Sequence, residues 1–356
     1  MDVFEQRFET PLPAATFGVT RLDGDSGGYL TASMDGRVHH IDSNGDHVKE
    51  LHQGHRSYAS RVVSIPESNW AISSGFDGRL VWYDLATSRE IRTVEAHRFW
   101  SWDLKRNIRG DKVASATGQY RTGGYRYEPA PLDEPGIKVF DVANGALAMA
   151  LETPAPALSL AWSSDDQYLA AATLMGDCLV WRMRDGEKVA HWRDDTFTSW
   201  GIIKSHHYIG GIFDLTFAED DELLIACGMG QMRDPMAGNG KQTWRAYRWR
   251  ENSPTPTREI DDKDQGRGLM EALALSPDGS RFLMAGRLAQ GSWNVALFDT
   301  ATGKLLGSMD NGTRVTGAQF SNDGSHVTLS GAKSQGKKQE DGWRAFGRLQ
   351  EYRINA

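Results

Sequence analysis

The chain has little cysteine, no long apolar run and no excess of basic charge. Cys178 and Cys227 are the only cysteines in 356 residues, and each stands in an apolar, strand-like run. So few thiols favour a reducing compartment over a disulfide framework. No apolar stretch approaches the ~20 residues that a membrane helix requires. The sequence therefore predicts neither a disulfide scaffold nor a membrane-spanning protein.

The first residues also lack the features of a secretion signal. They read MDVFEQRFET, which is acidic and polar where a signal peptide is basic and then apolar. We therefore expect a cytoplasmic protein. The formal net charge of the chain is −7, which disfavours general binding to nucleic acid or another polyanion.

A tight turn recurs seven times along the chain. Asp, Gly, Asn and Ser dominate it, because they tolerate the left-handed conformations of a hairpin and bond their own backbone. Each copy ends where an apolar strand begins. The copies are GDSGGYL (24–30), PESNWAI (66–72), IRGDKVA (108–114), SSDDQYL (163–169), AEDDELL (218–224), SPDGSRF (276–282) and SNDGSHV (321–327).

A second turn follows the first in most units, so each unit has two hairpins and therefore four strands. The strand before this turn ends in a bulky residue, usually followed by Asp. The turns are DSNGDHV (42–48), DLATSREI (84–91), DVANGAL (141–147), RDGEKV (184–189) and DTATGKL (299–305), and the bulky residues are Ile41, Tyr83, Phe140, Trp181, Trp249, Phe298 and Tyr352. Their spacing gives a base period of 41 residues (181 − 140 = 41), lengthened in places by insertions.

With GH at 54–55, AH at 96–97 and the bulky-Asp pair where that family has Trp-Asp, the chain resembles the WD40-repeat family over its whole length. In that family a side-chain network runs from Trp through Ser to His and Asp. Only two of the seven units keep Trp and three replace the Asp with Arg, so most units cannot complete the network. Unit two comes closest to it, with His55, Ser73 or Ser74, Asp77 and Tyr83.

We expect an all-β fold, a single seven-bladed β-propeller with four-stranded antiparallel blades. A four-stranded unit cannot bury both faces alone, and seven units stacked around an axis close a ring. The seventh unit shows only three strands, so we expect the N-terminal segment to supply the fourth and to hide an exposed edge. The expected segments are a closing strand at 1–13 and blades at about 14–52, 53–95, 96–152, 153–195, 196–260, 261–310 and 311–356.

Three insertions, 118–136, 228–243 and 331–346, fall between the second and third strands of blades three, five and seven. The resemblance places them on the face that carries the connections between blades, where partner peptides bind in that family. They and the connections beside them contain aromatic and Arg residues, the types that dominate interface hot spots. The predicted partner-binding residues are Tyr120, Arg121, Tyr125, Arg126, Tyr127, Trp100, Arg233, Trp244, Arg245, Trp343 and Arg344. A structural role is the alternative, in which the rings anchor long loops and the charges stay solvated.

Two of these regions are locally basic. Residues 231–250 hold five basic residues and one acidic residue, and 331–348 hold five and two. Such a sector prefers an acidic peptide, a phosphate or a nucleic-acid strand. Ordinary solvated loop charge explains the same counts, and nucleic acid is the less favoured partner.

Metal or catalytic chemistry is the other functional class. His206 and His207 precede a predicted inner strand that contains Asp214, and Asp103 lies on another inner strand. These carboxylates could meet in the central channel with the histidines above them and hold a divalent ion. The spacing is not a known ligand motif, and neither a P-loop nor a nucleophile elbow is present.

We therefore expect a non-enzymatic scaffold, without a cofactor, that binds a protein or peptide partner on the top rim. The alternative is a propeller enzyme, or a binder of metal or a small ligand, at the channel mouth. The identity of the partner and membership of a larger complex are left open by the sequence.

Overall fold

A computed structural model describes residues 2–22, 27–52, 54–118, 120–121, 126–129, 133–200, 206–230, 232, 240–334 and 345–355. For residues 52, 120–121, 126–129, 199–200 and 206–209 the description is limited to the backbone.

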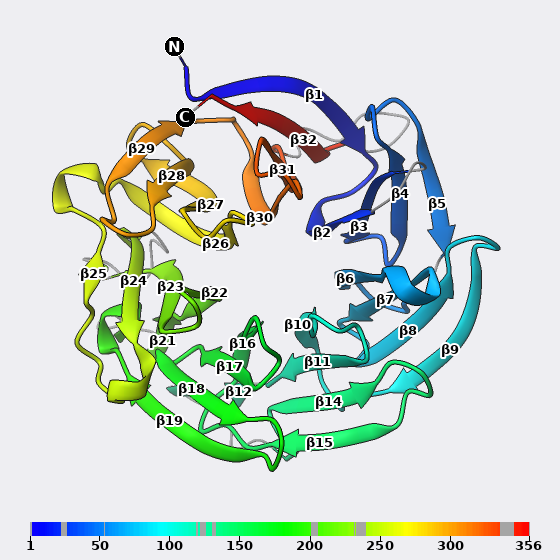
Figure 1. The fold of residues 1–356 in the computed structure, drawn as a ribbon, viewed down its shortest axis with the longest axis horizontal. Coiled ribbons are helices and arrows are strands. Elements are labelled where there is room, and N and C mark those ends of the chain that lie inside the picture. Colours follow the sequence, from blue (N-terminus) through cyan, green and yellow to red (C-terminus); the bar gives the residue numbers. More distant parts are fainter. Residues whose placement is uncertain are drawn as a thin grey trace.

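The described residues form a ring of seven four-stranded antiparallel sheets around a central channel (Figure 1). The chain is a seven-bladed β-propeller, as its repeats predict. From the channel outward, the blades are β2 (Thr16–Leu22), β3 (Gly28–Ser33), β4 (Val38–Asp42) and β5 (Val48–His52); β6 (Ala59–Ile65), β7 (Trp70–Gly75), β8 (Arg79–Asp84) and β9 (Arg89–Glu95); β10 (Ser101–Arg106), β11 (Lys112–Thr117), β14 (Ile137–Asp141) and β15 (Leu147–Leu151); β16 (Ala157–Trp162), β17 (Tyr168–Thr173), β18 (Asp177–Arg182) and β19 (Glu187–Arg193); β22 (Ile212–Ala218), β23 (Leu223–Met229), β24 (Gln242–Arg248) and β25 (Arg258–Glu259); β26 (Arg267–Leu275), β27 (Arg281–Gln290), β28 (Val295–Asp299) and β29 (Leu305–Met309); and β30 (Arg314–Phe320), β31 (His326–Ala332), β32 (Gly347–Ile354) and β1 (Phe4–Leu12). Short 3₁₀ turns stand at η1 (Pro66–Ser68), η2 (Asp195–Phe197), η4 (Trp249–Glu251) and η5 (Asp262–Asp264).

The second turn of the repeat forms as its composition predicts. Its glycine adopts a positive φ in four blades, a conformation that costs glycine little and other residues more. These glycines are Gly45 (φ 79°), Gly145 (φ 70°), Gly186 (φ 73°) and Gly303 (φ 71°). The turn residues therefore set where the third strand ends and the fourth begins.

The N-terminal strand closes the ring, as predicted. β1 pairs antiparallel with β32 from Phe4 opposite Ile354 to Leu12 opposite Gly347, so both chain ends lie at the same blade (Figure 1). The pairing covers the edge of β32, which would otherwise be open to another chain.

Buried apolar side chains form a cluster between each pair of neighbouring blades in the described part of the chain. The cluster between blades seven and one is small, and a charged network supplements it. There the buried Glu351 accepts hydrogen bonds from Tyr29 (2.5 Å), Arg21 (2.7 Å) and Arg7 (3.2 Å). Cys178 and Cys227 are free thiols within the core.

An additional small sheet lies outside the seven blades. Its order is β12 (Tyr120–Arg121), β13 (Arg126–Pro129), β21 (His206–Gly210) and β20 (Thr198–Trp200). The parallel pairing of β13 with β21 joins the insertion of blade three to the connection between blades four and five. The sequence predicts these segments on one face but gives no sign that they pair. No helix in the described residues has the length and apolar character to cross a membrane.

Candidate binding site at the channel mouth

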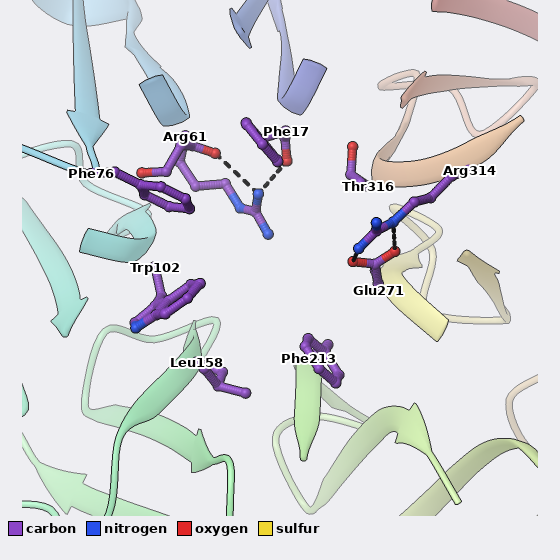
Figure 2. A pocket seen from close by; sticks show the side chains of 10 residues that line it. Phe17, Arg61, Phe76, Trp102, Leu158, Phe213, Glu271, Arg314 and Thr316 are labelled. Carbon is purple, nitrogen blue, oxygen red and sulfur yellow. Dashed lines mark hydrogen bonds and ion pairs between the residues drawn. The ribbon is translucent and has the colours of Figure 1, made fainter. Parts of the chain in front are cut away.

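Each inner strand carries a β-bulge, at its second or third residue in six blades and at Glu271, the fifth residue of β26, in blade six. In every blade the pairing of the first strand with the second skips one residue. A bulge redirects the side chain of the extra residue. The seven skipped residues, which all line one cavity on the channel axis (Figure 2), are Phe17, Ser60, Trp102, Leu158, Phe213, Glu271 and Thr316.

The cavity opens on the face that carries the connections between blades, because each inner strand begins directly after such a connection. We call this the top face. The register of blade three places the connection between its second and third strands at the same end, since Thr117 pairs with Ser101 and Ala116 with Ile137. The same holds in blades five and seven, where Gly228 pairs with Ile212 and Thr243, and Ala332 pairs with Arg314 and Gly347. The three long insertions therefore leave their blades on the top face, as expected.

The cavity has a volume of about 160 Å³. An apolar cavity of roughly this size admits benzene, so the mouth has room for one side chain of a partner. Three aromatic residues, Phe17, Phe76 and Trp102, form one wall, which Leu158 and Phe213 continue around the ring (Figure 2). Thr316 and the Arg314–Glu271 pair lie across the cavity from Phe76 and Trp102.

An aromatic cluster of six rings extends from this wall over blades one to three. At its centre Phe76 and Trp100 stack with ring centroids 4.5 Å apart and planes within 4° of each other. Tyr58 and Trp100 are 38% and 39% exposed, respectively. The aromatic cluster comprises Phe17, Tyr58, Phe76, Phe99, Trp100 and Trp102.

Two arginines provide the charge at the mouth. The Nε atom of Arg61 donates to Asp103 at 3.1 Å, and its Nη1 atom donates to the carbonyl oxygens of Phe17 and Ser60. Arg314 forms a two-pronged pair with Glu271, with N–O distances of 2.6 and 2.7 Å. Such paired guanidinium groups are held in a fixed orientation.

Deeper in the channel, Asp103 and Asp214 are both buried, and each accepts a hydrogen bond from the backbone of the next blade. Asp103 accepts the backbone N–H of Leu160 at 2.9 Å, and Asp214 accepts that of Leu273 at 2.9 Å. Each carboxylate thus ties its inner strand to the next blade. Burial raises the pKa of Asp214, and the charge of Asp103 adds to this effect against the opposing Lys105.

Lys105 places a cation beside Asp214. Its Nζ atom lies 3.5 Å from Asp214. Burial alone would lower the pKa of Lys105, but the attraction of Asp214 and Asp103 outweighs it, and the pKa is raised. Within the described residues no group of three or more His, Cys, Asp or Glu side chains could hold a metal ion. His206 and His207 begin β21, where only the backbone is described.

The side-chain network expected in blade two is present. His55 pairs with Asp77 through Nδ1 at 3.0 Å and with Ser73 through Nε2 at 2.8 Å, and Ser73 lies 3.4 Å from the hydroxyl of Tyr83. Tyr83 stands where the WD40 pattern has Trp. A Cβ atom at Gly54 would lie 1.8 Å from that hydroxyl, so only glycine fits there.

Nine of the eleven predicted partner-binding residues fall into three groups. Trp100 is exposed and belongs to the aromatic cluster. Tyr120, Arg121, Arg126 and Tyr127 lie on β12 and β13 of the additional sheet, where only the backbone is described. The residues that lie outside the described part of the chain are Tyr125, Arg233, Trp343 and Arg344.

The assignment of Trp244 to a contact surface is wrong. β24 begins at Gln242, so Trp244 is the third residue of a strand, not part of the insertion. Its side chain is completely buried between blades five and six, against Phe282 and Phe298. A strand position that faces a neighbouring blade cannot contact a partner.

Arg245 and its basic neighbours are largely neutralised by acidic residues. Arg245 forms 2.7 Å pairs with Asp194 and Glu259, and Lys241 pairs with Asp262 at 3.0 Å. Within the described residues, part of the local excess of basic charge in 231–250 is thus offset by acidic residues from other parts of the chain.

Sequence reasoning missed Phe17, Phe76, Arg61, Trp102 and Phe213. Trp102 and Phe213 directly precede Asp103 and Asp214. The sequence suggested these two carboxylates as metal ligands, and the aromatic residues before them were not considered. In a regular strand neighbouring side chains point to opposite faces, so only the bulges bring the rings to the channel axis.

No protein-family model matches the chain, and a search among curated proteins finds no match either. The chain is therefore classified by its fold, a seven-bladed β-propeller.

Proposed function

We propose that this propeller is a non-enzymatic scaffold that binds a segment of a partner polypeptide across the channel mouth, on the top face of blades one to three. The observation that carries the proposal is the exposed aromatic cluster beside a cavity of one side chain's size. Contiguous exposed apolar surface on a folded domain marks interaction sites.

The aromatic cluster suits binding because its rings are already held in place. Trp100 stacks on both Phe76 and Phe99, the latter at 4.9 Å, and a preordered surface loses little entropy when a partner docks. Trp and Tyr are also the residue types enriched in interface hot spots. Tyr58 and Trp100 thus supply rigid, exposed anchors beside a pocket that excludes water around an inserted side chain.

The insertions extend this proposal. The pairing of β13 with β21 brings Tyr120, Arg121, Arg126 and Tyr127 beside the connection that ends at blade five. We propose that this small sheet forms a second wall of the binding surface, on the side away from blade one.

We also propose that the propeller is of WD40 type. The network of His55 with Ser73 and Asp77 in blade two supports this assignment, since it joins the residues that the resemblance implies. Trp82 and Tyr83 precede Asp84 at the end of the third strand, where the family pattern has Trp-Asp.

Site-specific photo-crosslinking tests the proposed function. Benzoylphenylalanine replaces Trp100, and in a control protein it replaces Leu147, which is 53% exposed on the outer strand β15. In the native host we expect discrete polypeptide adducts from position 100 that Tyr58→Ser removes, and none of the same adducts from position 147. Identical adducts from both positions would contradict the proposal.

Metal analysis of the purified protein tests the alternative function, a metal site at the channel mouth. A stoichiometric ion in the purified protein that is lost on Asp103→Asn or Asp214→Asn would favour a metal site in the channel over a polypeptide site.

A further inference from the structure

The polar groups around the mouth differ in whether their hydrogen bonds are already made. Ser60 Oγ lies 2.9 Å from Ser74 Oγ, and Thr316 Oγ1 donates to the carbonyl oxygen of Thr16 at 2.5 Å. Both carboxylate oxygens of Glu271 accept from Arg314. The hydroxyl and carboxylate groups of the lining are therefore engaged within the protein.

The two guanidinium groups retain free N–H donors. Within the described residues, Nη2 of Arg61 has no partner, although Nε and Nη1 are both bonded. The Nη1 atom of Arg314 is likewise without a partner in that part of the chain. Figure 2 shows the unbonded nitrogen of Arg61 directed into the cavity, with no dashed line to it. What the mouth offers to a ligand is thus unused guanidinium N–H donors, on arginines that are each already paired with one carboxylate.

The rim beside the aromatic cluster carries two further arginines. The exposed residues Arg56 and Arg98 each follow a buried histidine in the connection that enters a blade, in HRSY (55–58) and HRFW (97–100). The nearby acids are turned toward the protein, since Asp77 accepts the N–H of Arg56 at 2.8 Å and Glu134 that of Arg98 at 2.7 Å. The arginine side chains carry no ion pair within the described residues.

We propose that the segment bound at the mouth is acidic, and that it inserts a Glu or Asp side chain whose carboxylate pairs with Arg61 while an adjoining apolar residue packs on the aromatic cluster. This inference rests on the proposed function and specifies its ligand. A carboxylate supplies the acceptors that the free guanidinium N–H groups lack, and charge-assisted pairs of this kind are the stronger hydrogen bonds. The aromatic walls exclude water, which strengthens the pair further.

Selection from a random dodecapeptide library, displayed so that no free C-terminal carboxylate is present, tests the inference. The library is selected on the wild-type protein and counter-selected on the Tyr58→Ser/Trp100→Ser variant. We expect enriched peptides with Glu or Asp at one fixed position next to an apolar residue.

Synthetic, C-terminally amidated versions of the selected peptides then give the affinity. Glu→Gln in the peptide should weaken binding to the wild type at least tenfold, and binding to Arg61→Gln less than twofold. Because Arg61→Gln also removes the partner of Asp103, Arg61→Lys serves as a second variant. It keeps a cation beside Asp103 but loses the planar guanidinium donors, and we expect a loss of threefold or more. Arg184→Gln, at an exposed arginine on the β18–β19 turn, is the matched control and should leave affinity unchanged.

The outcomes separate the two proposals. Enriched peptides with Lys or Arg at the fixed position, or with no charged residue there, overturn the acidic ligand and leave the scaffold in place. Failure to enrich any peptide on the wild type over the Tyr58→Ser/Trp100→Ser variant overturns both.

Discussion

The hydroxyl of Tyr29 on β3 donates a 2.5 Å hydrogen bond to the carboxylate of Glu351 on β32, and this bond joins the first blade to the last. Arg21 on β2 and Arg7 on β1 bind the same carboxylate. Four strands from the two ends of the chain therefore meet at one buried charge. Burial raises the pKa of Tyr29, and its hydrogen bond to Glu351 raises it further.

Removing this carboxylate should weaken ring closure. We expect Glu351→Ala to lower the free energy of unfolding by about 3–5 kcal/mol, because a buried ion-pair network loses its centre. Denaturant unfolding followed by tryptophan fluorescence measures the change. The matched control is Glu5→Ala, an exposed position on β1, which should change stability by at most about 0.5 kcal/mol. Equal effects of the two variants would contradict a role in closure.

Two tryptophans that look alike in the sequence should behave in opposite ways. Trp244→Ala should cost about 3–5 kcal/mol of stability, since it empties a site between two blades. Trp100→Ala should cost about 1 kcal/mol, the value of a surface aromatic contact, yet abolish binding of the selected peptides. Thermal unfolding and peptide affinity, measured on both variants, check this contrast. It would be refuted by retained peptide binding in Trp100→Ala.

The network in blade two should contribute strongly to stability. His55→Ala leaves Asp77 and Ser73 without their shared partner in a buried site, which should cost about 2–4 kcal/mol. His47→Ala, at an exposed turn position, is the control, with an expected change near zero. A similar melting temperature for both variants would show that the network is dispensable.

Stability should fall on the acid side because of His97. Burial lowers the pKa of His97 to about 3, with a smaller effect from Lys138. Its Nε2 atom pairs with Ser115 at 2.9 Å, and the Glu134 carboxylate, 3.9 Å from Nδ1, is itself paired with Lys138. Above the ordinary histidine pKa of about 6.5 the ring is neutral in the folded and in the unfolded protein. In that range the free energy of unfolding does not change with pH through this group.

Between about pH 6.5 and 3 the unfolded chain binds a proton that the folded protein excludes. The free energy of unfolding should therefore fall with decreasing pH by up to about 1.4 kcal/mol per unit from this group. Denaturant unfolding of the wild type and of His97→Gln at several pH values isolates the term. Below about pH 6.5 we expect the free energy of unfolding to fall less steeply with decreasing pH in His97→Gln than in the wild type. Equal slopes in the two proteins would rule the explanation out.

The sequence by itself determined the blades and their closure. Turns such as Asn44-Gly45 and Asn144-Gly145 fix local backbone angles. Together with the first turn, which recurs seven times, they set the strand order because antiparallel hairpins form between neighbours in the chain. The N-terminal strand was predictable as well, since the seventh unit lacks a fourth strand. The partners of His55 followed from the resemblance at fixed spacing within one blade.

Only the tertiary structure decided the site. The bulges that turn Phe17 and Trp102 toward the axis leave no mark in the residue pattern, because a one-residue shift in pairing depends on the neighbouring strand. The burial of Trp244 and the neutralisation of Arg245 depend on blades that are distant in sequence. What a chain places at the centre of a ring is set by how the sheets pack around it, and local propensities do not contain that information.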